Sequence, residues 1–380
     1  MKTTIGVISL KKKKIIAAML CILMFISITT GTSSANAPTI SAGSAIVMDV
    51  KTGRILYSKN MNNKKPMAST TKIMTALLAL ENSKPNDLVK IHKKAVGVEG
   101  SSIYLQPNEE LKMQDLIYGL MLRSGNDSAV AIAHQISGSA EDFAHLMNKR
   151  AKEIGALNTN FMNPHGLHHD EHYTTAYDLG LISREALLNE EFNKVVQTKV
   201  WVAEREGFKY FHNKNRTLSE FSGGDGVKTG FTKAAGRCLV TSATRNGMQL
   251  VCVVLNAPNW FQDSYQLLNY AFDEYQPWKV IDKDTPLKTV TISNGKKEST
   301  KVICPEDIIV PVTEEEKDKI VTVLELGETV NAPILRGTKL GRAKVYVDNK
   351  LLYTTILTSR EDIEQKNILD RISNFIRKKS

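Results

Sequence analysis

Residues 67–80 read MASTTKIMTALLAL, in which Ser69 and Lys72 stand three positions apart just before a run of apolar residues. Three residues of α-helix turn the chain by about 300°, so both side chains would share one face of a helix that begins here. Backbone N–H groups at a helix N-terminus are unpaired and can bind an oxyanion. By itself, however, the pattern is more typical of an N-capping serine followed by a surface lysine.

The other two Ser-x-x-Lys matches in the chain have poorer contexts. One begins at Ser9, in the N-terminal leader, and the other begins at Ser293, in a polar Asn-Gly turn. Only Ser69 is followed by an apolar helical pattern, which runs from Ile73 to Leu80. We therefore keep Ser69 as the candidate nucleophile and look for further groups that would support it.

The chain has 380 residues, 42% of them apolar and 7% aromatic, which is typical of a globular protein with one large and one smaller domain. Lysines at 11–14 precede an apolar stretch at 15–28, too short for a membrane span, and Ala35-Asn36-Ala37 resembles a cleavage site. This pattern predicts a signal peptide at residues 1–37. The leader carries five lysines and no acidic residue, so the remaining chain has a net charge near +5, and we expect no nucleic-acid binding.

Strand and helix patterns alternate in blocks between residues 44 and 275. The sequence predicts two strands around a turn at Lys51-Thr52-Gly53, and two more joined at Asn246-Gly247. Helices are predicted between these pairs, at 73–80, 111–122, 129–136, 143–154 and 175–188, and another follows at 260–275. Strands at both ends with helices between them indicate one α+β domain whose sheet is assembled from distant parts of the chain.

A different pattern begins near residue 287, after a predicted linker at Pro277 to Pro286. Short strands separated by turns predict a small all-β, sandwich-like module. The last 20 residues return to a helical period, with Ile368, Leu369, Ile372, Phe375 and Ile376 on one face and a basic end. This tail is typical of a helix that lies in a membrane interface, and a terminal helix packed on the β module is the alternative.

Three cysteines remain after the leader: Cys238, Cys252 and Cys304. Such an odd and sparse set is not a disulfide framework. A two-residue turn at Asn246-Gly247 would place Cys238 and Cys252 on opposite faces of the sheet. We therefore predict buried apolar thiols and no bridge.

Two further short motifs change the interpretation of Ser69. Ser124-Gly125-Asn126 lies between two predicted helices, so that a tight turn could project both polar side chains into one cleft. Lys228-Thr229-Gly230 begins a predicted strand, where the glycine permits close approach of a ligand to the backbone. A second Lys-Thr-Gly at Lys51 lies in a hairpin turn and precedes Ser69, so we interpret it as a turn.

Ser-x-x-Lys, Ser-x-Asn and Lys-Thr-Gly in this order resemble the three motifs of penicillin-recognising serine enzymes. The chain is similar to the low-molecular-mass penicillin-binding proteins that are serine-type D-alanyl-D-alanine carboxypeptidases, also in the segments NPHGL, TTAYDLG and NAPILRGTKLG. The resemblance implies an antiparallel sheet flanked by helices, the penicillin-binding/β-lactamase-like fold, at 38–283. It further implies a β-sandwich-like domain at 284–358 and an amphipathic membrane-associating tail at 359–380.

The resemblance also implies a role for each motif residue. Ser69 would attack the peptide carbonyl, Lys72 would act as its base, and Ser124 would relay a proton to the leaving D-Ala. Asn126 would bind a substrate amide, and Lys228, Thr229 and Gly230 would hold the terminal carboxylate. The backbone N–H groups of Ser69 and Phe231 would form the oxyanion hole. No cofactor is implied.

The substrate implied is a peptidoglycan stem peptide ending in D-Ala-D-Ala, with β-lactams as covalent inhibitors. We expect an exported protein, peripheral on the outer face of the cytoplasmic membrane through its tail. A class A β-lactamase is disfavoured, because the chain has Ser-Gly-Asn and no evident deacylating glutamate near residues 163–166.

Two other functions remain open at this point. The histidines at 165, 168, 169 and 172 could ligate zinc in a metal-dependent cell-wall peptidase, although they lack the H-E-x-x-H spacing. A non-hydrolytic penicillin-sensing or wall-binding protein would use the same fold. Such a protein would be expected to lack one of the motif side chains, and all of them are present here.

Overall fold

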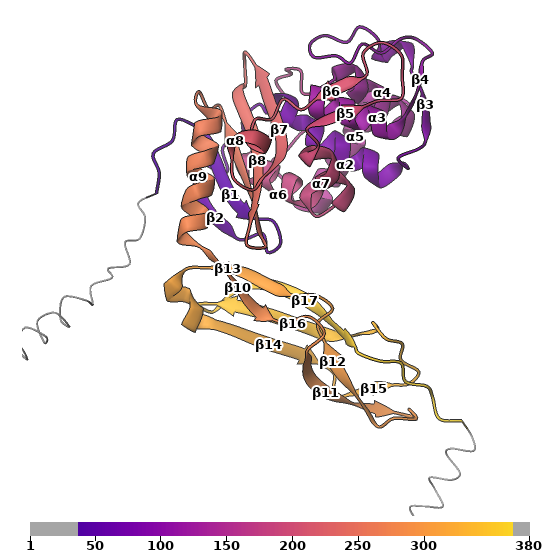
Figure 1. Cartoon of the computed structure of the whole chain (residues 1–380), viewed down its shortest axis with the longest axis vertical. Helices are drawn as coiled ribbons and strands as arrows, with labels where there is room; N and C mark the ends of the chain where they lie inside the picture. Colours follow the sequence, from indigo (N-terminus) through magenta and orange to yellow (C-terminus); the bar gives the residue numbers. More distant parts are fainter. Residues whose placement is uncertain (1–36, 368–380) are drawn as a thin grey trace, which may run out of the picture. The chain divides into compact units, whose positions relative to one another are not determined.

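A computed structural model describes residues 37–367 of the chain. Its larger domain contains a five-stranded antiparallel sheet of order β2-β1-β9-β8-β7, built from two segments about 160 residues apart in sequence (Figure 1). The strands are β1 (Ser44–Asp49), β2 (Ile55–Lys59), β7 (Gly224–Thr232), β8 (Gly236–Arg245) and β9 (Met248–Leu255). The predicted assembly of one sheet from distant parts of the chain is confirmed.

The hairpin between β8 and β9 turns where the Asn-Gly pair predicts it. Arg245 is paired with Met248, and the two residues between them, Asn246 and Gly247, have φ angles of 49° and 78°. Two consecutive positive φ angles match the twist of the flanking strands, which is why Asn-Gly is favoured there.

Both faces of the sheet are covered, so its strands are apolar on both sides. Ile46 and Met48 of β1 face the core shared with most of the helices, whereas Ala45 and Val47 face the core under α9 (Trp260–Glu274) (Figure 1). The cysteines follow the same alternation: Cys238 lies in the first core and Cys252 in the second, both as buried free thiols. The prediction of opposite faces and no disulfide is confirmed.

Between the two halves of the sheet, the helices that lie close to their predicted positions are α2 (Lys72–Asn82), α4 (Asn126–Ser137), α5 (Ala140–Ile154) and α6 (Ala176–Leu187). The same part of the chain contains α3 (Met113–Tyr118), within the predicted helix 111–122, and α7 (Glu190–Gln197) and the short α8 (Thr217–Glu220), which were not predicted. At the start of α6 the hydroxyl of Thr175 accepts a hydrogen bond from the backbone N–H of Asp178, as is typical of an N-capping threonine.

One predicted helix, 111–122, is wrong as a continuous α-helix. Its first residues form β4 (Glu110–Lys112), which pairs with β3 (Leu88–Lys90), and α3 gives way to a π-helical turn at Gly119–Arg123. A second small hairpin, β5 (Val200–Val202) with β6 (Tyr210–His212), was also not predicted. Periodicity does not distinguish α from π turns, because both bury the same apolar residues.

The smaller domain is all-β, as predicted, with its own apolar core. Its main sheet has the order β14-β16-β17-β12-β11-β15, made of β11 (Pro286–Ser293), β12 (Ser299–Ile303), β14 (Ile320–Leu326), β15 (Thr329–Asn331), β16 (Lys339–Val347) and β17 (Lys350–Ser359). The predicted linker at 277–286 is wrong, because β10 (Gln276–Ile281) pairs with β13 (Ile308–Val312). Pro277 faces Pro311 in this two-stranded sheet, where prolines are tolerated at an edge.

The terminal predictions lie largely outside the described residues. This holds for the signal peptide and for the tail from 368 onward. Residues 361–367 are described and are not helical: Ile363 bridges Ile334 and Gln365 bridges Gly295, so the helical prediction is wrong for this part. Within residues 37–367, no helix has the length and apolar character needed to cross a membrane. The predicted domain boundaries at 283/284 and 358/359 stay predictions.

Candidate active site

Ser69 lies in a 3₁₀ turn, Ala68–Thr71, that leads directly into α2. The α-helix itself begins at Lys72, so Ser69 precedes the helix rather than opening it. The side chain of Lys72 nevertheless reaches back, and its Nζ lies 3.1 Å from the Oγ of Ser69. The predicted pair is therefore in contact, one turn apart.

Lys72 has no solvent exposure, and its Nζ has three acceptors around it. Besides Ser69 Oγ, these are Oδ1 of Asn126 at 2.7 Å and the carbonyl of His165 at 2.6 Å. A neutral amine has two N–H groups and one lone pair. If Asn126 and His165 accept the two N–H groups, the lone pair is directed at the hydroxyl of Ser69, which is the arrangement a general base needs.

The electrostatic environment favours this neutral form. Burial lowers the pKa of Lys72 well below its usual value of 10.5, and the positive charge of Lys228 lowers it further. Asp127 opposes this with a smaller effect than that of Lys228, and Lys214 adds a weaker lowering effect. Lys214 belongs to none of the motifs and was not predicted. It lies in the segment between β6 and α8, and neither its spacing nor its neighbours in sequence indicate a role.

Ser124 and Asn126 converge on the same place from the end of the π-helical turn. Ser124 is buried and has a left-handed φ of 65°, which few residues other than glycine adopt, and α4 starts at Asn126. Among the described residues, the hydroxyl of Ser124 has no hydrogen-bond partner. Asn126 is held on both sides, because its Nδ2 donates to the carbonyl of Glu99 and its Oδ1 accepts from Lys72.

The loop that receives Asn126 is itself fixed by a carboxylate not singled out in the sequence. Asp127, fully buried, accepts the backbone N–H groups of Ile103 and Leu105 and the hydroxyl of Ser102. The backbone N–H of Asn126 donates to the carbonyl of Ser101 at 2.7 Å. Asp127 follows the Ser-x-Asn motif directly, and that adjacency is the only signal that could have revealed it.

The Lys-Thr-Gly motif lies on β7, at the edge of the sheet. A Cβ on Gly230 would come within 3.0 Å of the backbone nitrogens of Ser69 and Thr70, so this glycine lets β7 run against the nucleophile's turn. Lys228, two residues earlier on the same face, is 2% exposed and donates to the carbonyl of Thr229 at 2.9 Å. Burial, reinforced by Lys214, lowers the pKa of Lys228 to about 7. Phe231, which directly follows Gly230 of the motif, has an exposed side chain.

The other Lys-Thr-Gly sequence is a turn, as predicted. Lys51 forms an ion pair with Glu306 at 2.9 Å and donates to the carbonyl of Asp307. The hydroxyl and backbone N–H of Thr52 donate to Asp49. None of these contacts involves a residue of the candidate site.

The histidine-rich loop does not form a metal centre in the described chain, where no three His, Cys, Asp or Glu side chains lie in a metal-holding arrangement. His172 is buried with both ring nitrogens engaged, by Thr71 and by the backbone N–H of Met162. Nδ1 of His165 accepts the backbone N–H of Leu167. Burial lowers the pKa of His165 to about 3, so the ring is neutral near pH 7.

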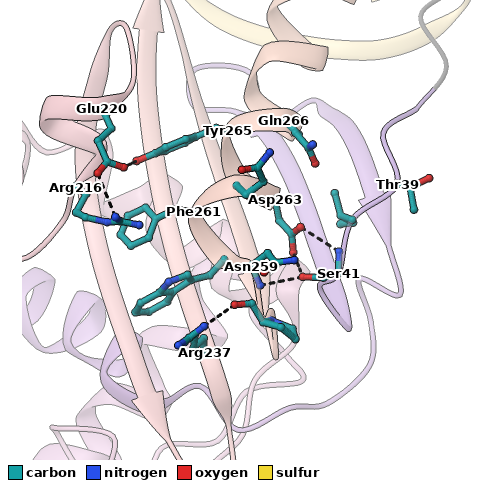
Figure 2. A pocket seen from close by; sticks show the side chains of 14 residues that line it. Thr39, Ser41, Arg216, Glu220, Arg237, Asn259, Phe261, Asp263, Tyr265 and Gln266 are labelled. Carbon is teal, nitrogen blue, oxygen red and sulfur yellow. Dashed lines mark hydrogen bonds and ion pairs between the residues drawn. The ribbon is translucent and has the colours of Figure 1, made fainter.

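A groove of about 820 Å³ lies elsewhere, between the N-terminal end of α9 and the segment around Ser41 (Figure 2). Arg237 and Arg216 line it, stacked on Trp260 and Phe261 with guanidinium-to-ring distances of 5.9 and 4.4 Å. It contains none of the motif residues, so it is separate from the candidate site.

A buried lysine in contact with a serine, beside an edge strand that carries a second lysine, is typical of the penicillin-recognising class of serine acyltransferases and hydrolases. A family model described as D-alanyl-D-alanine carboxypeptidase matches residues 31–259, and one described as the C-terminal domain of penicillin-binding protein 5 matches residues 275–365. The chain therefore belongs to the D-alanyl-D-alanine carboxypeptidase family.

Individual relatives agree with this assignment. The carboxypeptidase DacF of Bacillus subtilis is 33% identical over 339 residues, covering 86% of this chain and 87% of that protein. A D-alanyl-D-alanine carboxypeptidase of Streptomyces sp. strain K15 is 34% identical over 269 residues, covering 64% of this chain and 92% of its own length. Crystal structures of penicillin-binding protein 5 from Haemophilus influenzae match with a TM-score of 0.68 at 28% identity, covering 86% of this chain and 99% of that one.

The protein is a serine-type D-Ala-D-Ala carboxypeptidase, a peptidase with a penicillin-binding catalytic fold followed by an all-β domain. The predicted fold class and enzyme class are confirmed. The zinc peptidase has no support from the family match or from the geometry of the histidines.

Proposed function

We propose that this carboxypeptidase removes the terminal D-Ala of peptidoglycan stem peptides through an acyl-enzyme on Ser69. The observation that carries the proposal is the contact between Ser69 Oγ and the Nζ of Lys72, at 3.1 Å and with Lys72 fully buried. A serine becomes a nucleophile when an adjacent base removes its proton. Lys72 is the adjacent base.

In the first step Ser69 Oγ bonds to the carbonyl carbon of the penultimate D-Ala, while its proton moves to Lys72. The C–N bond then breaks, and the terminal D-Ala leaves as its amine after receiving a proton through Ser124. In the second step water hydrolyses the ester, releasing the shortened peptide and Ser69. Backbone N–H groups of Ser69 and Phe231 stabilise the oxyanion in both steps, supported by the close approach of β7 to the nucleophile's turn.

Substrate recognition depends on the free carboxylate of the terminal D-Ala. Lys228 and Thr229 hold it, and the positive potential of Lys214 attracts it. Asn126 has its amide N–H engaged by Glu99, so it orients Lys72 in the free enzyme and reaches a substrate amide only by exchanging one of these hydrogen bonds. A β-lactam uses the same attack on Ser69 and leaves an ester that hydrolyses slowly.

Labelling with a fluorescent penicillin, followed by peptide mapping, tests the acyl-enzyme. The label should lie on the peptide containing Ser69, and it should be absent from Ser69→Ala. D-Ala release from a synthetic peptide ending in D-Ala-D-Ala should be lost in the same variant. A label on another serine, or D-Ala release that persists in Ser69→Ala, would contradict the proposal.

We further propose that the protein is exported and peripheral on the outer face of the cytoplasmic membrane. Support comes from the composition of residues 1–37 and from the basic, amphipathic pattern of the tail after residue 367. Co-sedimentation of the mature protein with vesicles containing anionic lipid tests the tail. Binding should be lost in Ile372→Asp and unchanged in Ile356→Asp, on an exposed strand position of the second domain.

A further inference from the structure

The turn that carries Ser69 is a strained piece of backbone. Ala68 has a φ of 49°, in the left-handed region that is unfavourable for a non-glycine residue. Such a conformation persists only where its surroundings determine it. Ala68 is buried, and the contacts of its carbonyl show what determines it.

The carbonyl of Ala68 accepts a hydrogen bond from the hydroxyl of Thr71 at 2.8 Å. Thr71 Oγ1 also lies 2.8 Å from Nε2 of His172, which is 101 residues away in sequence and is 3% exposed. Since the only hydroxyl proton of Thr71 is donated to Ala68, its oxygen acts as the acceptor toward His172. The ring must therefore donate from Nε2.

The other ring nitrogen of His172 gives the same tautomer independently. The backbone N–H of Met162 donates to Nδ1 at 3.0 Å, so Nδ1 carries the lone pair and Nε2 carries the proton. Burial lowers the pKa of His172 to about 4, which keeps the ring neutral near pH 7. Both hydrogen bonds of the ring thus point in one direction, from Met162 through His172 to Thr71.

We propose that His172 is a positioning residue for the nucleophile: its Nε2–H fixes the hydroxyl of Thr71, which holds the carbonyl of Ala68 and thereby the turn that places Ser69 against Lys72. The inference rests on the proposed role of Ser69. His172 touches neither the substrate nor Ser69, so its effect is on the geometry of attack and not on proton transfer.

The test compares substitutions that keep different halves of this relay. The side chain in His172→Gln can place an amide N–H where Nε2 lies and reach Thr71. The shorter side chain in His172→Asn can accept a hydrogen bond from the backbone N–H of Met162, but it does not reach the hydroxyl of Thr71. His172→Leu removes both bonds. His168→Leu, an exposed position in the same loop, is the matched control.

The measurements are the acylation rate with a fluorescent penicillin, kcat and KM for a D-Ala-D-Ala peptide, and the thermal midpoint. His172→Leu and His172→Asn should lose about 10- to 100-fold in acylation rate and kcat, the size expected for a displaced nucleophile, with KM changed little. His172→Gln should recover most of the rate, and His168→Leu should match the wild type. Thr71→Val should reproduce the defect and add little to it in combination with His172→Leu.

If His172→Asn recovered the acylation rate and His172→Gln did not, the proposal would be overturned, because the hydrogen bond to Met162 alone would then account for the effect of the ring. ¹⁵N NMR of the wild-type protein gives a second test that needs no variant to fold. At pH 7 the His172 ring should be neutral with its proton on Nε2, and a proton on Nδ1 would overturn the relay. Absence of label on Ser69 in the wild type would instead refute the acyl-enzyme, so the two failures are distinguishable.

Discussion

At the scale of single residues, the candidate site depends on a lysine that has no carboxylate partner within hydrogen-bonding distance among residues 37–367. The Nζ of Lys72 is surrounded by a hydroxyl, an amide oxygen and a carbonyl, all of them neutral acceptors. A carboxylate in contact would stabilise the ammonium and raise the pKa, whereas neutral acceptors leave burial and the repulsion from Lys228 to dominate. The arrangement therefore favours a base at neutral pH.

Replacing Lys72 by arginine tests this requirement for a neutral amine. The guanidinium stays protonated under all conditions, so it cannot accept the proton of Ser69. Acylation by a fluorescent penicillin should fall about 10²- to 10⁴-fold, the usual contribution of a general base. Lys233→Arg, at an exposed position in the β7–β8 turn, should acylate normally. A folded Lys72→Arg protein that acylates within tenfold of the wild type would exclude the lysine as base.

The lowered pKa of Lys228 predicts a pH dependence of substrate capture. Its ammonium is present below a pH of about 7 and is lost as the pH rises through that value. Electrostatic attraction for the substrate carboxylate should fall in the same range, and kcat/KM reports the free enzyme. Lys228→Arg stays charged, so the ratio of its kcat/KM to that of the wild type should rise between pH 7 and 9. A ratio that is flat from pH 6 to 9 would show that Lys228 is charged throughout.

At the scale of elements, the loop at residues 163–167 holds the start of α2. The carbonyl of His165 accepts from Lys72, and the carbonyl of Pro164 accepts from Thr75 one turn further along α2. Gly166 lies so close to the nucleophile's turn that a Cβ there would come 1.9 Å from the oxygen of Ala68. No rotation of a side chain relieves a clash between a Cβ and backbone, so one of the two segments must move.

Gly166→Ala should therefore displace the turn that carries Ser69 and reduce kcat by about 100-fold, with acylation reduced in parallel. Gly155→Ala is the matched control. Gly155 has a φ of 92°, close to the 89° of Gly166, and a Cβ there meets nothing within 4 Å. This control should lose about 1–2 kcal/mol of stability from backbone strain and keep its activity. Equal activity of the two variants would show that the contact with Ala68 does not position Ser69.

The sequence predicts the elements well where local signals are strong. The Asn-Gly hairpin, the capped start of α6 and the apolar body of α2 all follow from residue type and period. The π-helical turn before Ser124 and the strand β10 were missed. The first depends on one extra residue per turn, and the second depends on pairing with β13, which lies about 30 residues further on.

The candidate site shows the same division. The motif residues could be recognised because each motif is a short pattern in the sequence: Ser69 with Lys72, Ser124 with Asn126, and Lys228 in Lys-Thr-Gly. Lys214 acts on Lys72 by its charge across 142 residues, and His172 bonds to Thr71 across 101 residues. Asp127 follows Asn126 directly, but it acts by binding the backbone of Ile103, 24 residues earlier in the chain. No spacing rule connects residues so far apart, and a single sequence does not reveal them.

At the scale of the whole molecule, the two domains have separate apolar cores. Their polar contacts include Lys51 with Glu306, and Arg54 with Glu316 and the carbonyl of Pro311. These contacts come from the turn of the first hairpin. Within residues 37–367, no hydrogen bond or ion pair joins the second domain to Ser69, Lys72 or Lys228. We therefore expect the site to form without the β domain.

A truncated protein ending at Tyr275 should for this reason fold. Its kcat/KM for a soluble D-Ala-D-Ala peptide should stay within about twofold of that of the full chain, because uncoupled parts of a protein have independent effects. The Streptomyces carboxypeptidase, matched over nearly its whole length by about two thirds of this chain, supports the expectation. Loss of the ion pairs at Lys51 and Arg54 should lower the thermal midpoint slightly. Ser69→Ala in the truncated protein controls for contaminating activity. If the truncated protein is folded by circular dichroism but more than tenfold less active, the β domain acts on the catalytic geometry, and the independence of the two cores does not extend to function.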